Sequence, residues 1–371
     1  MDKKNEIKNR WIIESKIMEV NLETDKQLKC LYELGQTGLD NIGNTCFMNT
    51  ALQCINAVKY FVGYFLSNQY NEDLNLRKKE VEFVESYANF LKTFWSENCQ
   101  VRPQKLKATM GKFYDPYAGF RQNDSAECYC KILELLHEGL SYKVEIISVD
   151  NGKPKNLMDR VNMMAIESWR KRYKDDFSIP LKLFYGQYWS RVKCMECGNV
   201  SHNFDPFGIV NLPVSGKTNT LEDCINYYVL SENMEEDNKI NCEKCKKKCN
   251  GKKKNTIWKL PPVLTIAFNR FDDYGNKINK RVEFPINRVK FGDLVERQSD
   301  KKSFYDLVAI ANHSGGLNGG HYWAYTKGTN GKWYEYNDAH ITEIREDALV
   351  SPRAYYLVYM RRHLSTELVI S

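Results

Sequence analysis

The sequence contains no long hydrophobic run, and this absence narrows the class of protein. No apolar stretch among its 371 residues approaches the ~18 residues that span a bilayer. The N-terminal stretch MDKKNEIKNRWIIESK is charged and lacks the uninterrupted apolar segment of a secretory signal. We therefore expect no membrane association and a location in the cytoplasm or the nucleus. Thiols stay reduced there, so the twelve cysteines need an explanation other than disulfides.

Acidic residues are missing from one lysine-rich stretch. The net charge is +7, from 54 Lys and Arg against 47 Asp and Glu. Residues 244–254, KCKKKCNGKKK, hold seven lysines and no acid, whereas basic and acidic residues balance over the rest of the chain. A solvated loop tip explains this stretch most simply, and a nuclear-import patch or a site for an acidic partner are the alternatives. A zinc-ribbon nucleic-acid binder would spread its basic residues over one face, so we do not expect nucleic-acid binding.

Internal repeats are absent, and strands and helices show little alternation. Apolar residues at helical spacing predict helices in residues 44–60, 78–95 and 123–140. The last of these opens with Asp124 and Glu127 in the pattern of a capping box. After about residue 180, short β-branched and aromatic runs predict strands, within 204–214, 262–271, 305–314, 321–328, 332–338 and 354–362. Helices followed by strands favour an α+β fold, with an antiparallel sheet packed against a helical lobe.

Two C-x-x-C pairs predict a metal site. Cys194 and Cys197 form the first pair and Cys242 and Cys245 the second, with residues 198–241 between them. Each pair places two sulfurs at adjacent corners of a tetrahedron, so four thiolates form a structural Zn²⁺ site without an open coordination position. Cys249 is an alternative fourth ligand with a less usual C-x-x-x-C spacing. We interpret six other cysteines as small hydrophobic residues: Cys30, Cys54, Cys99, Cys128, Cys130 and Cys224.

Cys46 stands apart because it lies where a polar loop, NIGNT, becomes an apolar helix. A helix N-terminus favours the thiolate through its dipole and its free backbone N–H groups. Among the six histidines, His321 stands out because glycines precede it and an aromatic strand follows it. Asn337 and Asp338 follow in WYEYND and can orient the His321 ring from a neighbouring strand. These residue types alone are weak grounds for a catalytic site, because most histidines are structural.

Longer segments resemble the ubiquitin-specific protease family. GLDNIGNTCFMNTALQCI resembles its cysteine box, and HSGGLNGGHYWAYTK, KWYEYNDAHIT and AYYLVYMRR resemble its histidine box and C-terminal strands. RQNDSAECYCKILELL resembles the glutamine-aspartate helix between the boxes, in which Gln122, Asp124 and Glu127 fit the pattern. FYGQYWSRVKCMECGNVSHNFDPF and CEKCKKK with IWKLPPVLTIAFNRF resemble the zinc-bearing fingers. The matches occur in family order from Gly38 to about Arg362.

The resemblance implies a papain-like α+β fold with a helical thumb, a β-rich palm and zinc-bearing β fingers. It also implies a deubiquitinating thiol hydrolase that cleaves after the C-terminal glycine of ubiquitin. Carried onto this sequence, it makes Cys46 the nucleophile, His321 the general base and Asn41 the side chain of the oxyanion hole. Asn337 takes the third triad position, with Asp338 as its acidic neighbour. The implied substrate-binding residues are Gln122, Asp124, Gly319, Gly320 and Tyr322.

The implied organisation is one large domain with short flanking segments. An N-terminal extension covers residues 1–37, the catalytic domain 38–363 and a C-terminal tail 364–371, with the fingers at about 185–270. The extension is polar with scattered apolar residues and forms either a packed helix or a partly ordered arm. We expect a monomer whose partners are ubiquitin and ubiquitinated proteins.

Two departures from the family pattern and two alternative functions stay open. Several family members have an acid where this chain has Asn337, and an amide holds an imidazole but stabilises imidazolium less. Apart from Arg270, the strand IAFNRF lacks the basic or histidine residues common there. A non-catalytic ubiquitin-binding scaffold is one alternative, against which the intact Cys46, His321 and Asn41 argue. A protease for a ubiquitin-like modifier is the other, and the sequence does not separate it from a deubiquitinase.

Overall fold

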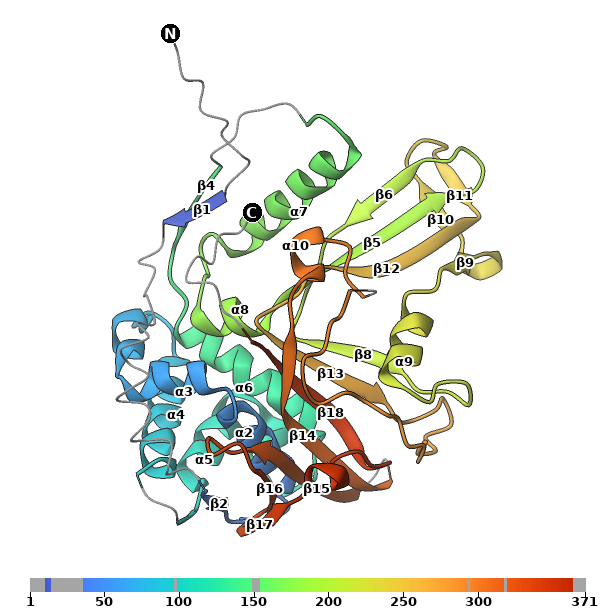
Figure 1. The fold of residues 1–371 in the computed structure, drawn as a ribbon. Coiled ribbons are helices and arrows are strands. Elements are labelled where there is room, and N and C mark those ends of the chain that lie inside the picture. The colour runs from blue at the N-terminus through green and yellow to red at the C-terminus, as the bar shows by residue number, and fades with distance from the viewer. Residues whose placement is uncertain are drawn as a thin grey trace.

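The structure of the chain is a computed structural model (Figure 1). Most of the predicted N-terminal extension and the predicted C-terminal tail lie outside the residues that the structure describes. The described ranges are 11–14, 36–96, 99–148, 154–292, 294–316 and 319–362.

The first half of the chain is mainly helical, and the three helices predicted from apolar spacing are confirmed as α2, α4 and α6. The helices are α2 (Cys46–Asn56), α3 (Lys59–Leu66), α4 (Val81–Phe94), α5 (Gln104–Phe113), α6 (Ser125–Gly139), α7 (Leu157–Tyr173) and α8 (Ile179–Phe184), with 3-10 turns η1 (Gln69–Asp73) and η2 (Asp115–Tyr117). We call α2 to α6 the helical lobe. In Figure 1, α7 lies apart from this lobe, beside the strands at the top of the molecule.

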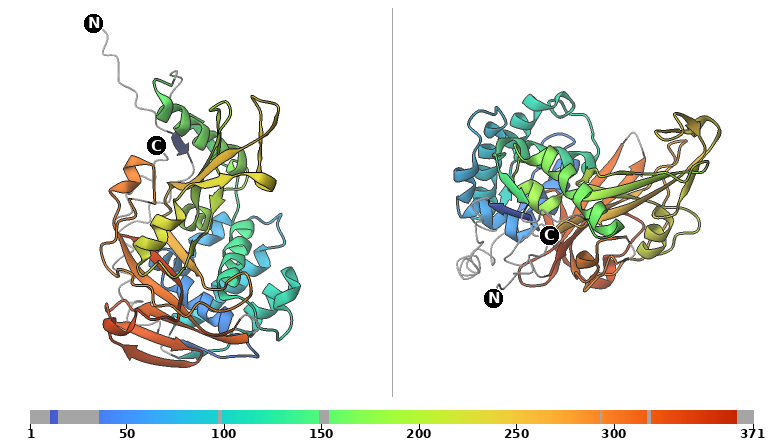
Figure 2. Two further views of the ribbon diagram at one scale, coloured as in Figure 1. Left: turned by 90° about the vertical axis from the view of Figure 1, so that its right-hand side faces the viewer. Right: turned by 90° about the horizontal axis from the view of Figure 1, so that it is seen from above.

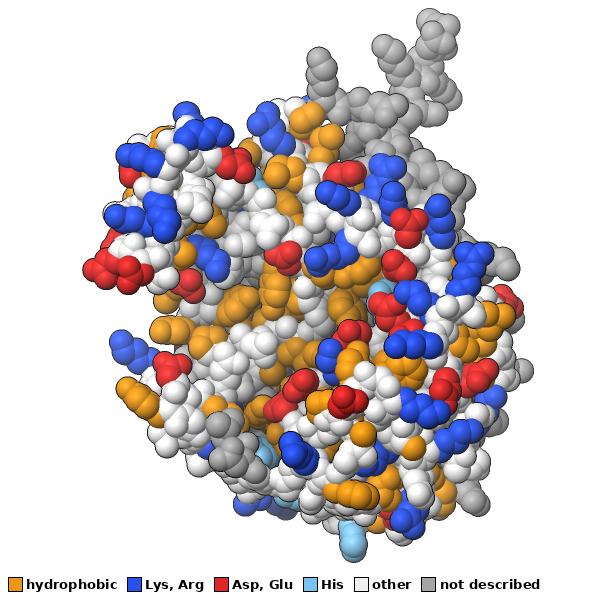
Figure 3. Space-filling view, turned by 180° about the vertical axis from the view of Figure 1, so that it is seen from behind, with side chains coloured by type: hydrophobic (Ala, Val, Ile, Leu, Met, Phe, Trp, Pro, Cys, Tyr) orange, Lys and Arg blue, Asp and Glu red, His pale blue; other side chains and the backbone are white. Residues whose placement is uncertain are grey.

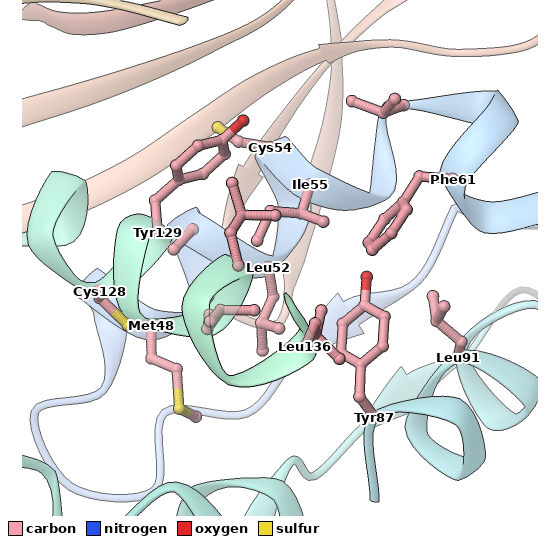
Figure 4. Close-up of a cluster of buried hydrophobic side chains, with 14 of the residues drawn as sticks. Met48, Leu52, Cys54, Ile55, Phe61, Tyr87, Leu91, Cys128, Tyr129 and Leu136 are labelled. Carbon is pink, nitrogen blue, oxygen red and sulfur yellow. The ribbon is translucent and has the colours of Figure 1, made fainter. Parts of the chain in front are cut away.

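Helix α6 begins where its sequence predicts. The Asp124 carboxylate accepts the backbone N–H of Glu127 at 2.9 Å, which satisfies one of the free amide groups of the first turn. One face of the helix is then apolar and buried, as its spacing predicts: Cys128, Ile132, Leu135, Leu136 and, just beyond its end, Leu140. Figure 4 shows this face against α2 and α4, with Met48, Leu52 and Ile55 of α2 packed on Leu136 and its neighbours.

A seven-stranded sheet, the palm sheet, forms the centre of the molecule. Its order is β17-β16-β15-β14-β18-β13-β8, and all its pairs are antiparallel except β13 with β8. The strands are β8 (Ile209–Pro213), β13 (Val263–Asn269), β14 (Tyr305–Gly316), β15 (Gly319–Lys327), β16 (Trp333–Asn337), β17 (His340–Ile344) and β18 (Ala354–Arg361). The predicted antiparallel sheet is therefore present. Its edge strand β8 is parallel to β13, which was not predicted from the sequence.

A second, five-stranded sheet, the finger sheet, extends away from the palm. Its order is β6-β5-β12-β9, and β7 pairs with β5. Its strands are β5 (Gly186–Cys194), β6 (Val200–Asn203), β7 (Pro206–Phe207), β9 (Glu232–Met234) and β12 (Gly251–Lys259), and the hairpin β10 (Ile240–Cys242) with β11 (Lys247–Cys249) lies at its tip. Seen from above in Figure 2, the fingers and the helical lobe project to opposite sides. The predicted finger span also contains β8 and β13, which lie in the palm sheet.

The remaining described elements connect these parts. Short pairs are formed by β1 (Trp11–Glu14) with β4 (Glu145–Ser148) and by β2 (Gly38–Leu39) with β3 (Gln100–Val101). The helices α9 (Leu221–Tyr228) and α10 (Gln298–Lys301) and the 3-10 turns η3 (Glu236–Asn238) and η4 (Glu346–Ala348) complete the set. None of the helices in the described ranges has the length and apolarity needed to cross a membrane.

The palm sheet is buried on both faces. Along β18, Tyr356 and Val358 belong to the core shared with the helical lobe, whereas Leu357 and Tyr359 belong to a second core on the other face. This alternation follows from the period of two in a β-strand. The α+β fold predicted from the sequence is confirmed, and its two cores meet at the sheet that carries His321.

Candidate active site and metal centre

Cys46 is the first residue of α2, and the loop before it is fixed by Asn41. The Asn41 side-chain oxygen accepts the backbone N–H groups of Gly43 at 3.2 Å and Thr45 at 3.1 Å. Gly43 and Asn44 both have positive φ, 109° and 54°, a backbone conformation that glycine and asparagine adopt most readily. This sharp turn presents the Cys46 sulfur at the start of the helix, where the sequence predicts it.

The Cys46 thiol is buried between the helical lobe and β15. Its residue is only 3% exposed, and its sulfur accepts hydrogen bonds from the backbone amides of Tyr322 and Phe47. Burial raises the pKa of Cys46, and the negative charge of Asp338 raises it further, while the backbone amides lower it in part. The helix N-terminus therefore does not by itself bring the pKa of this thiol below its ordinary value.

His321 lies on β15, directly before Tyr322, and its ring is held by Asn337. The distance from His321 Nε2 to Asn337 Oδ1 is 2.7 Å. Because the amide oxygen can only accept, Nε2 carries the proton and Nδ1 is left with a lone pair. The Trp323 ring stacks against the imidazole at 6.1 Å between centroids. An imidazole fixed in this tautomer can accept a proton at Nδ1.

Asp338 contacts amides and has a different role from Asn337. It has a φ of 51° and lies in the tight turn between β16 and β17, where Asn337 pairs with His340. Its two carboxylate oxygens accept Asn41 Nδ2 at 3.0 Å and Asn49 Nδ2 at 2.8 Å. The two adjacent residues thus serve different partners: Asn337 orients the imidazole, and Asp338 orients Asn41.

Gln122 fixes the glycine pair that precedes His321. Its side-chain oxygen accepts the Gly320 N–H at 2.8 Å, and its amide nitrogen donates to the Gly320 carbonyl at 3.0 Å. Gly319 lies beside it, because a Cβ added there would be 3.2 Å from the Gln122 oxygen. Gln122 thus links the start of α6 to the edge of β15 by a strand-like pair of bonds.

Asp124 contacts two tyrosines in addition to capping α6. Its second carboxylate oxygen accepts the hydroxyl of Tyr322 at 3.3 Å and that of Tyr355. The predicted substrate-binding residues therefore face one another in two pairings, Gln122 with the Gly319–Gly320 pair and Asp124 with Tyr322.

The five cysteines of the fingers converge at one place. The sulfurs of Cys194, Cys242, Cys245 and Cys249 all lie within 4.8 Å of one another, and the Cys197 sulfur is 3.6 Å from that of Cys242. Backbone amides of Cys197 and Glu196 donate to the Cys194 sulfur and lower the pKa of this thiol to about 6. A four-cysteine cluster of this size can hold a metal ion, and its residues suit Zn²⁺ because all the donors are thiols.

The lysine-rich stretch surrounds this cluster. Five of its lysines are exposed, Lys244, Lys246, Lys247, Lys248 and Lys252, and Lys247 forms an ion pair with Glu196 at 2.8 Å. In Figure 3 the fingers lie at the upper left, where Lys and Arg gather on the surface. The stretch is a solvated tip in this structure, as its simplest interpretation predicts.

Comparison with known proteins identifies the family. Residues 37–359, most of the chain, match the family described as ubiquitin carboxyl-terminal hydrolase. The chain belongs to this family. The resemblance noted in the sequence is thereby confirmed.

Individual relatives agree with this assignment. The chain is similar to Ubiquitin carboxyl-terminal hydrolase 21 from Homo sapiens, at 29% identity over 354 residues that cover 88% of this chain and 61% of that protein. It is similar to Ubiquitin carboxyl-terminal hydrolase Usp2 from Drosophila melanogaster, at 32% identity covering 88% of this chain and 35% of the relative. The chain thus spans less than two thirds of these relatives.

Solved structures support the fold. A chain of the SAGA Ubp8/Sgf11/Sus1/Sgf73 DUB module bound to ubiquitin aldehyde matches with a TM-score of 0.68 and 22% identity, covering 92% of this chain and 75% of that chain. At this identity the match supports the shared architecture of helical lobe, palm and fingers.

Two residues of this family member's site were missed in the sequence. Asn49 lies one turn after Cys46 and contacts Asp338. His313, on β14, stacks on Tyr322 with ring centroids 4.4 Å apart, and burial together with the nearby Lys277 lowers the pKa of His313 to about 4. A polar residue inside an apolar helical run was the available signal for Asn49. No sequence signal pointed to His313, because its position beside Tyr322 depends on how β14 pairs with β15.

Proposed function

We propose that the chain is a deubiquitinating thiol hydrolase, which cleaves the peptide or isopeptide bond after the C-terminal glycine of ubiquitin. The observation that carries this proposal is the His321–Asn337 pair next to Tyr322, whose backbone amide contacts the Cys46 sulfur, in a member of the ubiquitin carboxyl-terminal hydrolase family. A ubiquitin aldehyde complex among the similar structures supports ubiquitin as the substrate.

The chemistry is acyl transfer through a thioester. Nδ1 of His321 takes the Cys46 proton, and the thiolate attacks the carbonyl carbon of the C-terminal glycine. The resulting imidazolium gives this proton to the leaving lysine amine as the C–N bond breaks. Water then attacks the thioester, with His321 again accepting a proton, and free ubiquitin and the Cys46 thiol are released. Because burial raises the pKa of the Cys46 thiol, transfer of its proton to His321 assists the first step.

The oxyanion is stabilised by Asn41. One N–H of its amide donates to Asp338, which leaves the second N–H to donate to the oxyanion together with the Cys46 backbone N–H. One donor of this kind typically contributes about 2.7–4 kcal/mol to transition-state stabilisation. Asp338 therefore acts through Asn41, and Asn337 through His321.

The tail of ubiquitin passes along Gln122, Asp124, Gly319, Gly320 and Tyr322 in this proposal. Its basic residue meets the Asp124 carboxylate, and the narrow glycine pair lets its own glycines reach Cys46. The finger cysteines hold one structural Zn²⁺, which stabilises the tip of the finger sheet and takes no part in the reaction. A monomer in the cytoplasm or the nucleus stays our expectation for the protein.

Reaction with ubiquitin that carries a C-terminal thiol-reactive group tests the proposal. We expect one adduct per chain, located on Cys46 by mass spectrometry, together with cleavage of ubiquitin conjugates. Absence of labelling would favour the non-catalytic scaffold. Faster labelling by a probe built on a ubiquitin-like modifier would instead assign that modifier as substrate. An adduct on another cysteine would overturn the site.

A further inference from the structure

The finger tip offers one more thiol than a tetrahedral zinc ion uses. Sulfurs bound to one zinc at about 2.3 Å lie about 3.8 Å apart at the corners of a tetrahedron. Four sulfurs, those of Cys194, Cys242, Cys245 and Cys249, are mutually within 4.8 Å, and Cys197 is 3.6 Å from Cys242. The separations thus leave two candidates, Cys197 and Cys249, for the fourth position.

The two candidates differ in their surroundings. Cys197 is partly exposed and lies in the turn after β5, next to Gly198, which has a φ of 71°. Cys249 is fully buried at the end of β11, where it pairs with Ile240 of β10. The strand partner of Cys194 is Gly251, two residues after Cys249, so the β5–β12 pairing holds Cys249 beside the first pair. Neither candidate needs a change of fold to reach the other sulfurs.

We propose that this centre has two alternative ligand sets, which rests on the zinc binding proposed above. Cys194, Cys242 and Cys245 are constant ligands, and either Cys197 or Cys249 completes the tetrahedron. Exchange requires only that one thiolate replace another on the metal, with the proton passing from the entering thiol to the leaving one. The site then keeps zinc when one of the two exchangeable thiols is lost.

Zinc content and zinc transfer to a chromogenic chelator test this in the full chain. We expect one zinc per chain in wild type, Cys197→Ser and Cys249→Ser, and loss of zinc in the double variant and in Cys245→Ser. Cobalt in place of zinc reports the ligands directly, with the thiolate-to-metal band of four sulfurs kept in both single variants. Labelling of Cys46 by the ubiquitin probe checks that each variant is folded.

Unequal single variants would overturn the proposal. If Cys197→Ser loses zinc as Cys245→Ser does while Cys249→Ser behaves as wild type, the two C-x-x-C pairs are the sole ligand set. The converse result would make Cys249 the fixed fourth ligand. A wild-type protein that binds no zinc would refute the zinc centre itself. Failure of the zinc proposal can thus be told apart from failure of the two ligand sets.

A second inference concerns Asn49, which the hydrogen bonds of the catalytic site single out independently. Asn49 is 3% exposed, and its Nδ2 donates to Asp338 at 2.8 Å and lies 3.2 Å from the carbonyls of Leu39 and Asp40. Its own side-chain oxygen has no hydrogen-bond partner within the described residues. A buried acceptor without a hydrogen-bond partner carries a desolvation cost. A contribution to the stability of the fold therefore does not by itself explain why an amide is present at position 49.

We infer that Asn49 is a positioning residue for the oxyanion donor. It holds one oxygen of Asp338, whose other oxygen holds Asn41 Nδ2 at 3.0 Å. The backbone N–H of Leu39 donates to the Asp338 carbonyl at 2.9 Å, which ties the same turn to β2. This chain of contacts fixes which way the free N–H of Asn41 points. The inference rests on the proposed hydrolase activity.

The matched pair Asn49→Leu and Gln53→Leu tests this inference. Gln53 is also a buried amide of α2, 4% exposed, and it donates to the Thr37 carbonyl at 2.9 Å. We expect Asn49→Leu to lower kcat by up to about 10²-fold, the effect of a misplaced catalytic group, with little change in KM. Gln53→Leu has a similar effect on Tm and leaves kcat near wild type.

The decisive measurement combines Asn49→Leu with Asn41→Ala. Once the oxyanion donor is gone, its positioning no longer matters, so we expect the double variant to be as slow as Asn41→Ala alone. Additive losses would overturn the inference, as would an equal loss of kcat in Gln53→Leu. A wild-type chain with no activity on ubiquitin would refute the proposed function instead.

Discussion

At the scale of single residues, the neighbours Asn337 and Asp338 serve different partners. Asn337 accepts the imidazole N–H at 2.7 Å, and Asp338 accepts two side-chain amides. The sequence suggested both as partners of His321, because adjacent residues of a strand end cannot be told apart before the turn is known. The positive φ of Asp338 turns its side chain toward the Cys46 loop, and only the structure supplies this angle.

Asp338 also acts on the nucleophile through its charge. Burial raises the pKa of the Cys46 thiol, and the Asp338 carboxylate raises it further. Removing that negative charge stabilises the thiolate, so Asp338→Asn should shift alkylation of Cys46 to lower pH, although its midpoint stays above that of a free thiol. Peptide-resolved iodoacetamide labelling across pH measures this shift. Glu343→Gln, an exposed change on β17, is the control, and an unchanged midpoint in Asp338→Asn would contradict the expected effect.

Asp124 is tested by a change that keeps its cap. Asparagine caps a helix about as well as aspartate, so Asp124→Asn should leave Tm nearly unchanged while it removes the charge that faces the tail. We expect a lower kcat/KM for ubiquitin substrates. The loss should disappear with a ubiquitin whose tail arginine is replaced by leucine. An equal loss on both substrates would show that the carboxylate acts through Tyr322 and Tyr355.

At the scale of elements, the β14–β15 hairpin depends on a close backbone approach at Gly320. A Cβ at this position would lie 2.4 Å from both His313 Nε2 and the Ser314 carbonyl. We expect Gly320→Ala to lower the free energy of unfolding by about 1–3 kcal/mol, the usual cost of overpacking, and to lower activity with it. Gly319→Ala meets only the flexible Gln122 side chain at 3.2 Å and should unfold as wild type does. Chemical unfolding of both variants measures this difference. Equal free energies of unfolding would contradict the close backbone approach at Gly320.

The elements also show why some parts of the site were predictable and others were not. C-x-x-C spacing singled out Cys194, Cys242 and Cys245, which the structure brings together with Cys249, whereas the sequence offered Cys249 only as an alternative to Cys197. The position of Cys249 depends on how β10 and β11 pair, which spacing does not encode. Every residue of α2 is buried, so this helix has no polar face, and apolar periodicity could not reveal that Asn49 points at a functional neighbour.

At the scale of the whole molecule, the palm sheet joins two cores and places the site at their edge. The face of the sheet toward the helical lobe packs against α2 and α6, so α2, which carries Cys46, lies against β15, which carries His321, only when both parts are folded together. Residues nearly 300 positions apart, such as Asn41 and Asp338, are brought to 3.0 Å. The family resemblance supplied this arrangement before the structure, and local patterns did not.

The same architecture places the surface that we expect to bind ubiquitin apart from the buried thiol that we expect to react. Figure 3 shows a broad hollow lined with hydrophobic side chains between the fingers and the rest of the molecule, whereas Cys46 is only 3% exposed and offers almost no contact area. We therefore expect Cys46→Ala to abolish ubiquitin hydrolysis and probe labelling while it still binds ubiquitin. Bound ubiquitin should then stabilise the variant by about 2.7 kcal/mol at a concentration of 100 Kd. Tm measured with and without ubiquitin tests this expectation. No shift at saturating ubiquitin would mean that recognition depends on the thiol, and residual hydrolysis would mean that another residue is the nucleophile.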